Sequence, residues 1–197
     1  MPQELKINLS KTAIVVIDLQ KGIAALPAEP HPVKEVVENT VKLLTALREK
    51  NALIFLVHVT PSPDMKDSLH PISETSFPMN SFSKDWGEYL PELNIQSTDF
   101  LITKHQWGAF YGTELDLQLR RRGIDTIILC GIFTNFGVES TARFAFEYGY
   151  NQIFVEDAMS ARAKEAHEAS IQYVFPRLGL IRKTEEVLAA INSAKSA

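Results

Sequence analysis

Short apolar runs rich in β-branched residues recur along this chain, and segments with helical periodicity separate most of them. The first run reads TAIVVI over residues 12–17, and a similar run spans residues 126–130. Continuous apolar runs of this length are typical of strands buried on both faces of a sheet. Strands that alternate with helices require right-handed crossovers and favour a parallel sheet between helical layers. The pattern therefore predicts an α/β fold.

The runs predict six strands, and the segments between them predict the helices. The expected strands span residues 12–17, 52–59, 100–103, 126–130, 152–155 and 180–181. The expected helices span residues 32–51, 113–122, 135–148 and 165–175, and a last helix follows the sixth strand. A chain of 197 residues, 45% of them hydrophobic, can bury one sizeable core. We therefore expect a single domain over residues 1–197, built as a three-layer α/β/α structure around a mostly parallel six-stranded sheet.

The charge and cysteine content narrow the classes of partner. The 20 basic and 24 acidic side chains give a formal net charge of -4, so no strong field favours nucleic acid or a membrane surface. The chain has one cysteine and no apolar run approaching the ~20 residues that span a bilayer. These features predict a cytoplasmic protein that acts on a small molecule and needs no cofactor.

Polar residues directly after the apolar runs are the first candidates for a functional site. In open α/β sheets ligands bind outside the carboxyl ends of the strands, and there the sequence has Asp18, Thr60, Lys104 and the segment 131–137. An acid and a base at neighbouring strand ends could meet as a charge pair near a reacting atom. The alternatives are a carboxylate that caps the turn after residue 17 and a lysine that extends to solvent.

The segment 131–137, GIFTNFG, leads from a strand into a helix. Its free backbone N–H groups could bind an oxyanion or a carboxylate. Any strand-to-helix turn has such donors, so this segment alone does not identify a site.

Several motifs together resemble the isochorismatase-like hydrolases, also called the cysteine hydrolase superfamily. They are DLQ at 18–20, KHQWGAFYGTEL at 104–115, CGIFTNFGVESTARFAFEYGY at 130–150 and EDAMSA at 156–161. The resemblance covers essentially the whole chain and implies the Rossmann-like isochorismatase fold. It also implies that Asp18 and Lys104 match the catalytic aspartate and lysine of the family.

Gly137 is the main departure from the cysteine-dependent members, because it stands where they carry a nucleophilic cysteine. Glycine cannot form an acyl enzyme. True isochorismatases also have glycine there, since hydrolysis of a vinyl ether requires protonation and water. Cys130 lies seven residues earlier within an apolar run, so we interpret it as an inert core thiol.

Three functional hypotheses remain open. The first is water-mediated hydrolysis of a small substrate, such as a vinyl ether, with Asp18 as proton donor and Lys104 orienting it or stabilising negative charge. The second is a non-catalytic binding or interaction protein. The third is an amidase that uses Thr134, Ser140 or Thr141, although hydroxyls at a helix start commonly bond to the backbone.

The predicted substrate-binding residues flank the two strand-end segments. The resemblance suggests a non-proline cis peptide near Ile132 and Phe133, which would aim the Phe133 N–H into the pocket. Aromatic side chains could wall a flat pocket, and for each of them core packing is the alternative; the full predicted set is Thr60, Trp107, Phe110, Ile132, Phe133, Phe136 and Gly137. Isochorismatases have a glutamine near the position of Thr60, which puts isochorismate itself in doubt as the substrate.

Metal binding and assembly complete the sequence predictions. His31, His58, His70, His105 and His167 lack zinc-ligand spacing, so we expect no required metal. The proline-rich loop 60–98, which contains Phe82 and Trp86, is predicted to be either a lid or a subunit contact. Family members commonly oligomerise, so the resemblance implies a homo-oligomer.

Overall fold

The computed structural model of the chain describes residues 5–75 and 83–195. A six-stranded sheet forms its centre, with the strand order β3-β2-β1-β4-β5-β6. The strands are β1 (Thr12–Ile17), β2 (Leu53–Val59), β3 (Phe100–Lys104), β4 (Thr126–Ile132), β5 (Asn151–Ser160) and β6 (Leu180–Arg182). All five neighbouring pairs are parallel, so the sheet is entirely rather than mostly parallel.

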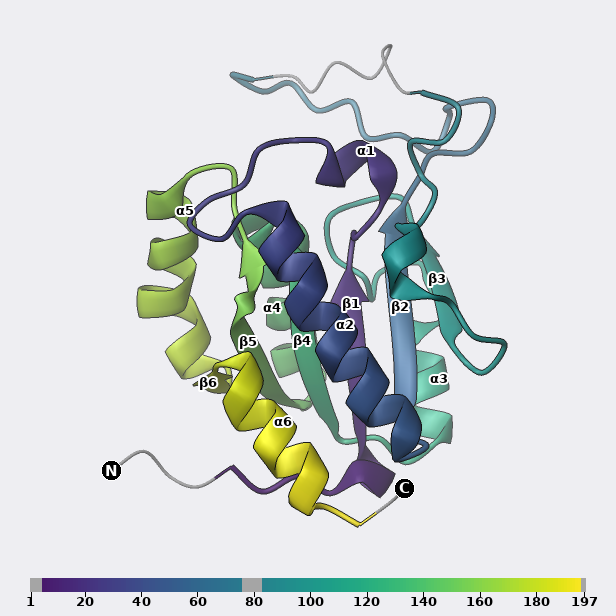
Figure 1. Cartoon of the computed structure of the whole chain (residues 1–197). Helices are drawn as coiled ribbons and strands as arrows, with labels where there is room; N and C mark the ends of the chain where they lie inside the picture. The colour runs from purple at the N-terminus through teal and green to yellow at the C-terminus, as the bar shows by residue number, and fades with distance from the viewer. Residues whose placement is uncertain (1–4, 76–82, 196–197) are drawn as a thin grey trace.

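Helices cover both faces of the sheet (Figure 1). The α-helices are α1 (Lys21–Ala24), α2 (Val33–Glu49), α3 (Leu115–Arg121), α4 (Glu139–Glu147), α5 (Lys164–Ala169) and α6 (Thr184–Ser193). Helices α2 and α6 lie in front of the sheet in the figure, and α3 and α4 lie behind it. The predicted three-layer α/β/α architecture is therefore confirmed.

Strand β1 shows how the sequence pattern produces these layers. Side chains alternate across a strand, so Ile14 and Val16 pack with the residues of α2 and α6, whereas Val15 and Ile17 pack with those of α3 and α4. Both clusters are almost inaccessible to water. A run such as TAIVVI fits only a strand covered on both faces.

The structure refines three of the predicted elements. Strand β5 runs to Ser160, well beyond the predicted residue 155, after a register shift against β4 between Leu129 and Gly131. The helix predicted over 135–148 begins as a π-turn, Thr134–Val138, before α4. The helix predicted over 165–175 divides into α5 and a second π-turn, Ser170–Val174. Hydrophobic periodicity does not separate α from π hydrogen bonding, so these breaks had no signal.

The loop predicted over 60–98 is only partly described. Phe82 lies outside the described residues, whereas Trp86 lies inside them and its backbone oxygen accepts a hydrogen bond from the Gly22 N–H, at 2.9 Å. Tyr89 pairs with Gln20 in an isolated antiparallel bridge. The second half of the loop therefore contacts the segment after β1. No helix in residues 5–75 and 83–195 is both long and apolar enough to cross a membrane.

Candidate active site

Asp18 and Lys104 form a buried ion pair at the carboxyl edge of the sheet. The Nζ atom of Lys104 lies 2.8 Å from Oδ2 of Asp18 and donates a second hydrogen bond to the backbone oxygen of Trp107, at 2.6 Å. Asp18 is 3% exposed and Lys104 is 1% exposed. The pair is therefore a fixed feature of the interior, unlike an exposed salt bridge, which contributes little to stability.

The prediction of neighbouring strands is wrong, because β2 lies between β1, which leads to Asp18, and β3, which ends at Lys104. Two strand spacings are about 9.6 Å, which a lysine side chain can largely bridge. Strict alternation would place residue 18 on the α2 face with Val16, but Asp18 has a φ of 54°. Aspartate tolerates this left-handed conformation better than most residues. The break in alternation frees the carboxylate from the α2 face and accompanies its contact with Lys104.

Burial has the largest effect on the pKa of the Asp18 carboxyl group. Desolvation is the largest effect and raises the pKa of its carboxyl group, while Lys104 and His58 act in the opposite direction. Oδ1 of Asp18 is buried and has no hydrogen-bond partner among the described residues. A carboxyl group with a raised pKa and one uncommitted oxygen is suited to donate a proton.

Gly137 faces this ion pair from the π-turn Thr134–Val138. A Cβ atom at this position would lie 2.8 Å from Oδ2 of Asp18 and 3.2 Å from Nζ of Lys104. Gly137 thus meets Asp18, more than 100 positions earlier in the sequence, and Lys104, about 30 positions earlier, at one point. The glycine also leaves room for the close Asp18–Lys104 contact, which any larger side chain would disturb.

Apart from Thr60, the remaining predicted residues fall into three groups. The peptide bond between Ile132 and Phe133 is cis, as the resemblance suggested, and both side chains are buried. Trp107 and Phe136 are exposed at the surface, where their rings meet edge to face with centroids 4.9 Å apart. Phe110 lies in the core, where it packs against Tyr148 and Tyr150. For Phe110 the structure thus agrees with the alternative of core packing.

Thr60 directly follows β2 and lies next to Lys104, but its side chain is not part of the buried ion pair. Its N–H bonds to the backbone oxygen of Lys104, at 3.1 Å. Its side chain lines a shallow depression together with His58, Gly87 and Tyr89. No contact between the Thr60 hydroxyl and Asp18 appears among the described residues, so its role as a substrate ligand stays a prediction.

Two of the three alternative nucleophiles have committed hydroxyl groups. Thr141 donates to the backbone oxygen of Gly137, at 2.7 Å, and accepts from the N–H of Ala109, at 3.1 Å. Thr134 Oγ1 lies 2.9 Å from Nδ1 of His167. Ser140 is half-buried in the first turn of α4. Burial raises the pKa of the Cys130 thiol to about 12, which fits the interpretation of an inert core cysteine.

Gln20 has a structural role that the DLQ motif alone does not reveal. Its side chain is fully buried and forms three bonds to backbone groups, one from the N–H of Val59 and two to the oxygens of Val59 and Trp86. Gln20 therefore ties the segment after β1 to the end of β2 and to the long loop. Its place two residues after Asp18 was the only signal.

Comparison with known proteins identifies the family to which the chain belongs. The family model described as "Isochorismatase domain" matches residues 12–186. The chain belongs to the isochorismatase family. Among its relatives, it is 50% identical over 195 residues to the "Uncharacterized isochorismatase family protein YwoC" of Bacillus subtilis, covering 97% of this chain and all of that protein.

A second relative and a solved structure agree with this family. The isochorismatase family protein YecD of Escherichia coli O157:H7 is 46% identical over 187 residues, covering 95% of this chain and all of that protein. The structure of an isochorismatase family protein from Burkholderia thailandensis is 40% identical, with a TM-score of 0.91, and covers 95% of this chain and 98% of that one. Family membership supports the assignment of the chain as a hydrolase. The names of these three proteins do not state a substrate.

Proposed function

We propose that this isochorismatase-family protein hydrolyses a small molecule without a protein nucleophile, with Asp18 as general acid and Lys104 as its charged partner. The observation that carries the proposal is the position of Gly137. Its absent Cβ would lie within 3.2 Å of both Asp18 Oδ2 and Lys104 Nζ. We infer that this is the place of the family's nucleophilic cysteine, and glycine there leaves water as the attacking group.

A vinyl ether is the substrate class that matches these groups. Protonated Asp18 gives its proton to the terminal vinyl carbon, and water adds to the resulting oxocarbenium carbon. The water's proton returns to Asp18. The hemiketal then breaks its C–O bond while its hydroxyl proton passes to the departing oxygen, which gives an alcohol and a ketone. Lys104 stabilises the carboxylate that exists between the two proton transfers.

Asp18→Asn should lower the hydrolysis rate by about 100- to 10,000-fold, because the amide keeps the shape of the acid but cannot donate the proton. The measurement is a hydrolysis screen of the purified wild type and variant with isochorismate, other vinyl ethers, nicotinamide and small amides. Asp125→Asn is the matched control, since Asp125 is half-exposed and its carboxylate contacts Lys11, at 3.7 Å, and the hydroxyl of Thr126, at 2.7 Å, away from the candidate site. Full activity in Asp18→Asn would remove Asp18 from the mechanism.

The rate should also fall as the pH rises through the pKa of Asp18. The acid form is the proton donor, and burial raises that pKa above its ordinary value, so activity persists to a higher pH than an exposed aspartate would allow. A pH profile of kcat/KM for the active substrate measures this limb. A rate that instead increases through this range would identify the carboxylate as the working form and would make Asp18 a base.

A binding protein without turnover is the second candidate, and one observation favours it. Asp18 and Lys104 are 3% and 1% exposed, so the pair is almost closed to solvent. A ligand would then use the surface around Trp107 and Phe136 without reaching the pair. Silence across the hydrolysis screen, together with saturable binding of one of its compounds, would favour this function.

A further inference from the structure

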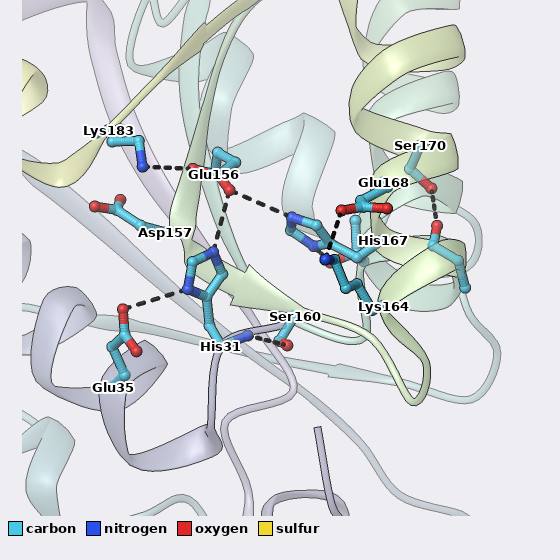
Figure 2. A network of polar contacts seen from close by, with 12 residues as sticks. His31, Glu35, Glu156, Asp157, Ser160, Lys164, His167, Glu168, Ser170 and Lys183 are labelled. Carbon is cyan, nitrogen blue, oxygen red and sulfur yellow. Dashed lines mark hydrogen bonds and ion pairs between the residues drawn. The ribbon is translucent and has the colours of Figure 1, made fainter. Parts of the chain in front are cut away.

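A second polar cluster lies at the carboxyl edge of the sheet, apart from the Asp18–Lys104 pair. It contains His31 from the loop before α2, Glu156 from β5 and His167 from α5. Figure 2 shows both imidazole rings directed at the carboxylate of Glu156. These three residues are distant in sequence, so ligand spacing gave no sign of the cluster.

We propose that His31, Glu156 and His167 form a binding site for a divalent transition-metal ion, with Zn²⁺ as the best match. The proposal departs from the expectation of no metal, and it does not depend on the proposed hydrolytic function. Two imidazole nitrogens and one carboxylate oxygen are ligands typical of zinc, and they leave a further position for water or a small ligand.

The distances fit one shared ion. Nε2 of His31 lies 3.1 Å from Oε1 of Glu156, and Nε2 of His167 lies 3.6 Å from the same oxygen. The three ligand atoms all lie within 4.8 Å of one another. In tetrahedral zinc sites with bonds near 2.1 Å, ligand atoms are about 3.4 Å apart. Small side-chain adjustments would therefore complete the coordination.

The outer nitrogens of both rings are already held. Nδ1 of His31 lies 3.3 Å from a carboxylate oxygen of Glu35, and Nδ1 of His167 lies 2.9 Å from the hydroxyl of Thr134. Metal-binding histidines usually have such an outer partner, which fixes the ring and leaves the other nitrogen free to coordinate. With Nδ1 protonated, Nε2 of each ring presents a lone pair toward the Glu156 carboxylate. A cation bound between them would remove the repulsion between these lone pairs and the carboxylate oxygen.

His167 provides an independent observation. It is 1% exposed, and its Nε2 has no hydrogen-bond partner within residues 5–75 and 83–195. A buried polar atom without a partner is costly, and in native structures it often marks an ion or water site. This nitrogen lies next to the oxygen of Glu156 that also faces His31.

The charges around Glu156 are compatible with an ion. Its Oε1 atom faces the rings of both His31 and His167. The carboxylate is the form of a glutamate side chain that coordinates a metal ion. Lys183 lies 3.5 Å from the other oxygen, Oε2, and its side chain is 66% exposed, so it can turn to solvent when a cation binds.

Backbone and side-chain hydrogen bonds hold the three ligand segments in place. Glu29 and Ala161 exchange two backbone hydrogen bonds, at 2.8 and 2.9 Å, which joins the loop before His31 to the end of β5. The N–H of His31 also donates to Ser160 Oγ, at 3.3 Å. Thr134, the outer partner of His167, begins the turn that contains Gly137. A bound ion would thus connect this loop, β5 and α5 beside the candidate active site.

The test is metal binding by the full-length, untagged protein after treatment with a chelator. We expect one equivalent of Zn²⁺ to bind per chain by calorimetry, to raise the melting temperature, and to be replaceable by Co²⁺ with the visible absorption of a nitrogen- and oxygen-ligated site. Glu156→Gln and His31→Gln should abolish stoichiometric binding, and Glu35→Gln should weaken it by about 10- to 100-fold. Circular dichroism checks that each variant remains folded.

His70→Gln is the matched control, because His70 is an exposed histidine outside the cluster. It should bind Zn²⁺ like the wild type. The proposal is overturned if the wild type binds less than stoichiometric Zn²⁺, or if folded Glu156→Gln and His70→Gln bind it equally well. Either result would mean that the two histidines and Glu156 form only a hydrogen-bonded ion-pair network.

Discussion

Lys104→Met should lower the free energy of unfolding by about 3 to 5 kcal/mol at pH 7, the usual cost of removing one partner from a buried ion pair. Lys104 is 1% exposed, and its ammonium is the cationic partner of Asp18. The variant leaves a buried carboxyl group that must bind a proton or remain an unpaired charge. Urea denaturation of wild type and variant measures the difference.

The cost of Lys104→Met should depend on pH in a defined direction. Burial already raises the pKa of Asp18, and loss of Lys104 removes an effect that lowers it. The folded variant then retains a proton that the unfolded chain loses above about pH 3.9, so stability falls as the pH rises from there toward the folded-state pKa. Below the unfolded-state pKa the variant should be closest to the wild type.

Two further variants test the assignment of this energy to the pair. Lys11→Met removes an exposed lysine 3.7 Å from Asp125 and should change stability by no more than about 0.5 kcal/mol. Asp18→Asn/Lys104→Met should recover much of the loss, because no unpaired charge stays buried. If the double variant is as unstable as Lys104→Met, packing of the lysine chain rather than charge explains the cost.

Residues at strand ends were the part of the candidate site that the sequence could predict. Asp18 and Lys104 each follow an apolar run, and parallel strands bring such positions to one edge of the sheet. The sequence could not predict that they meet across β2, because strand order depends on packing between distant elements. It also could not give the left-handed backbone at Asp18, which reverses the expected face.

The His31–Glu156–His167 cluster shows the opposite case. Its members come from a loop, a strand and a helix, and no local pattern connects residues 31, 156 and 167. Strand β5 was predicted to end at residue 155, one position before Glu156, because the apolar run ends there. The strand instead continues through the less apolar residues 156–160 after a register shift. Tertiary contacts alone bring these side chains together. The homo-oligomer and the cytoplasmic location stay predictions from the sequence.

Gly131→Ala should be the most destabilising small substitution near the candidate site, with a loss of about 3 kcal/mol or more in the free energy of unfolding. Gly131 has a φ of +115°, which side chains rarely adopt, and a Cβ would overlap the backbone of Ile17, 2.6 Å from its nitrogen. The collision is with the neighbouring strand β1, which cannot move without breaking the sheet.

Gly112→Ala separates backbone strain from steric overlap in this prediction. Gly112 has a φ of +68°, but a Cβ there meets no heavy atom of the described residues within 4 Å, so the expected cost is only about 1 to 2 kcal/mol. Chemical denaturation of both variants gives the comparison. Equal losses would show that φ alone sets the cost. A larger loss for Gly131→Ala would mean that close contact with Ile17 requires glycine here, one residue before the Ile132–Phe133 peptide and directly beside the strand that positions Asp18.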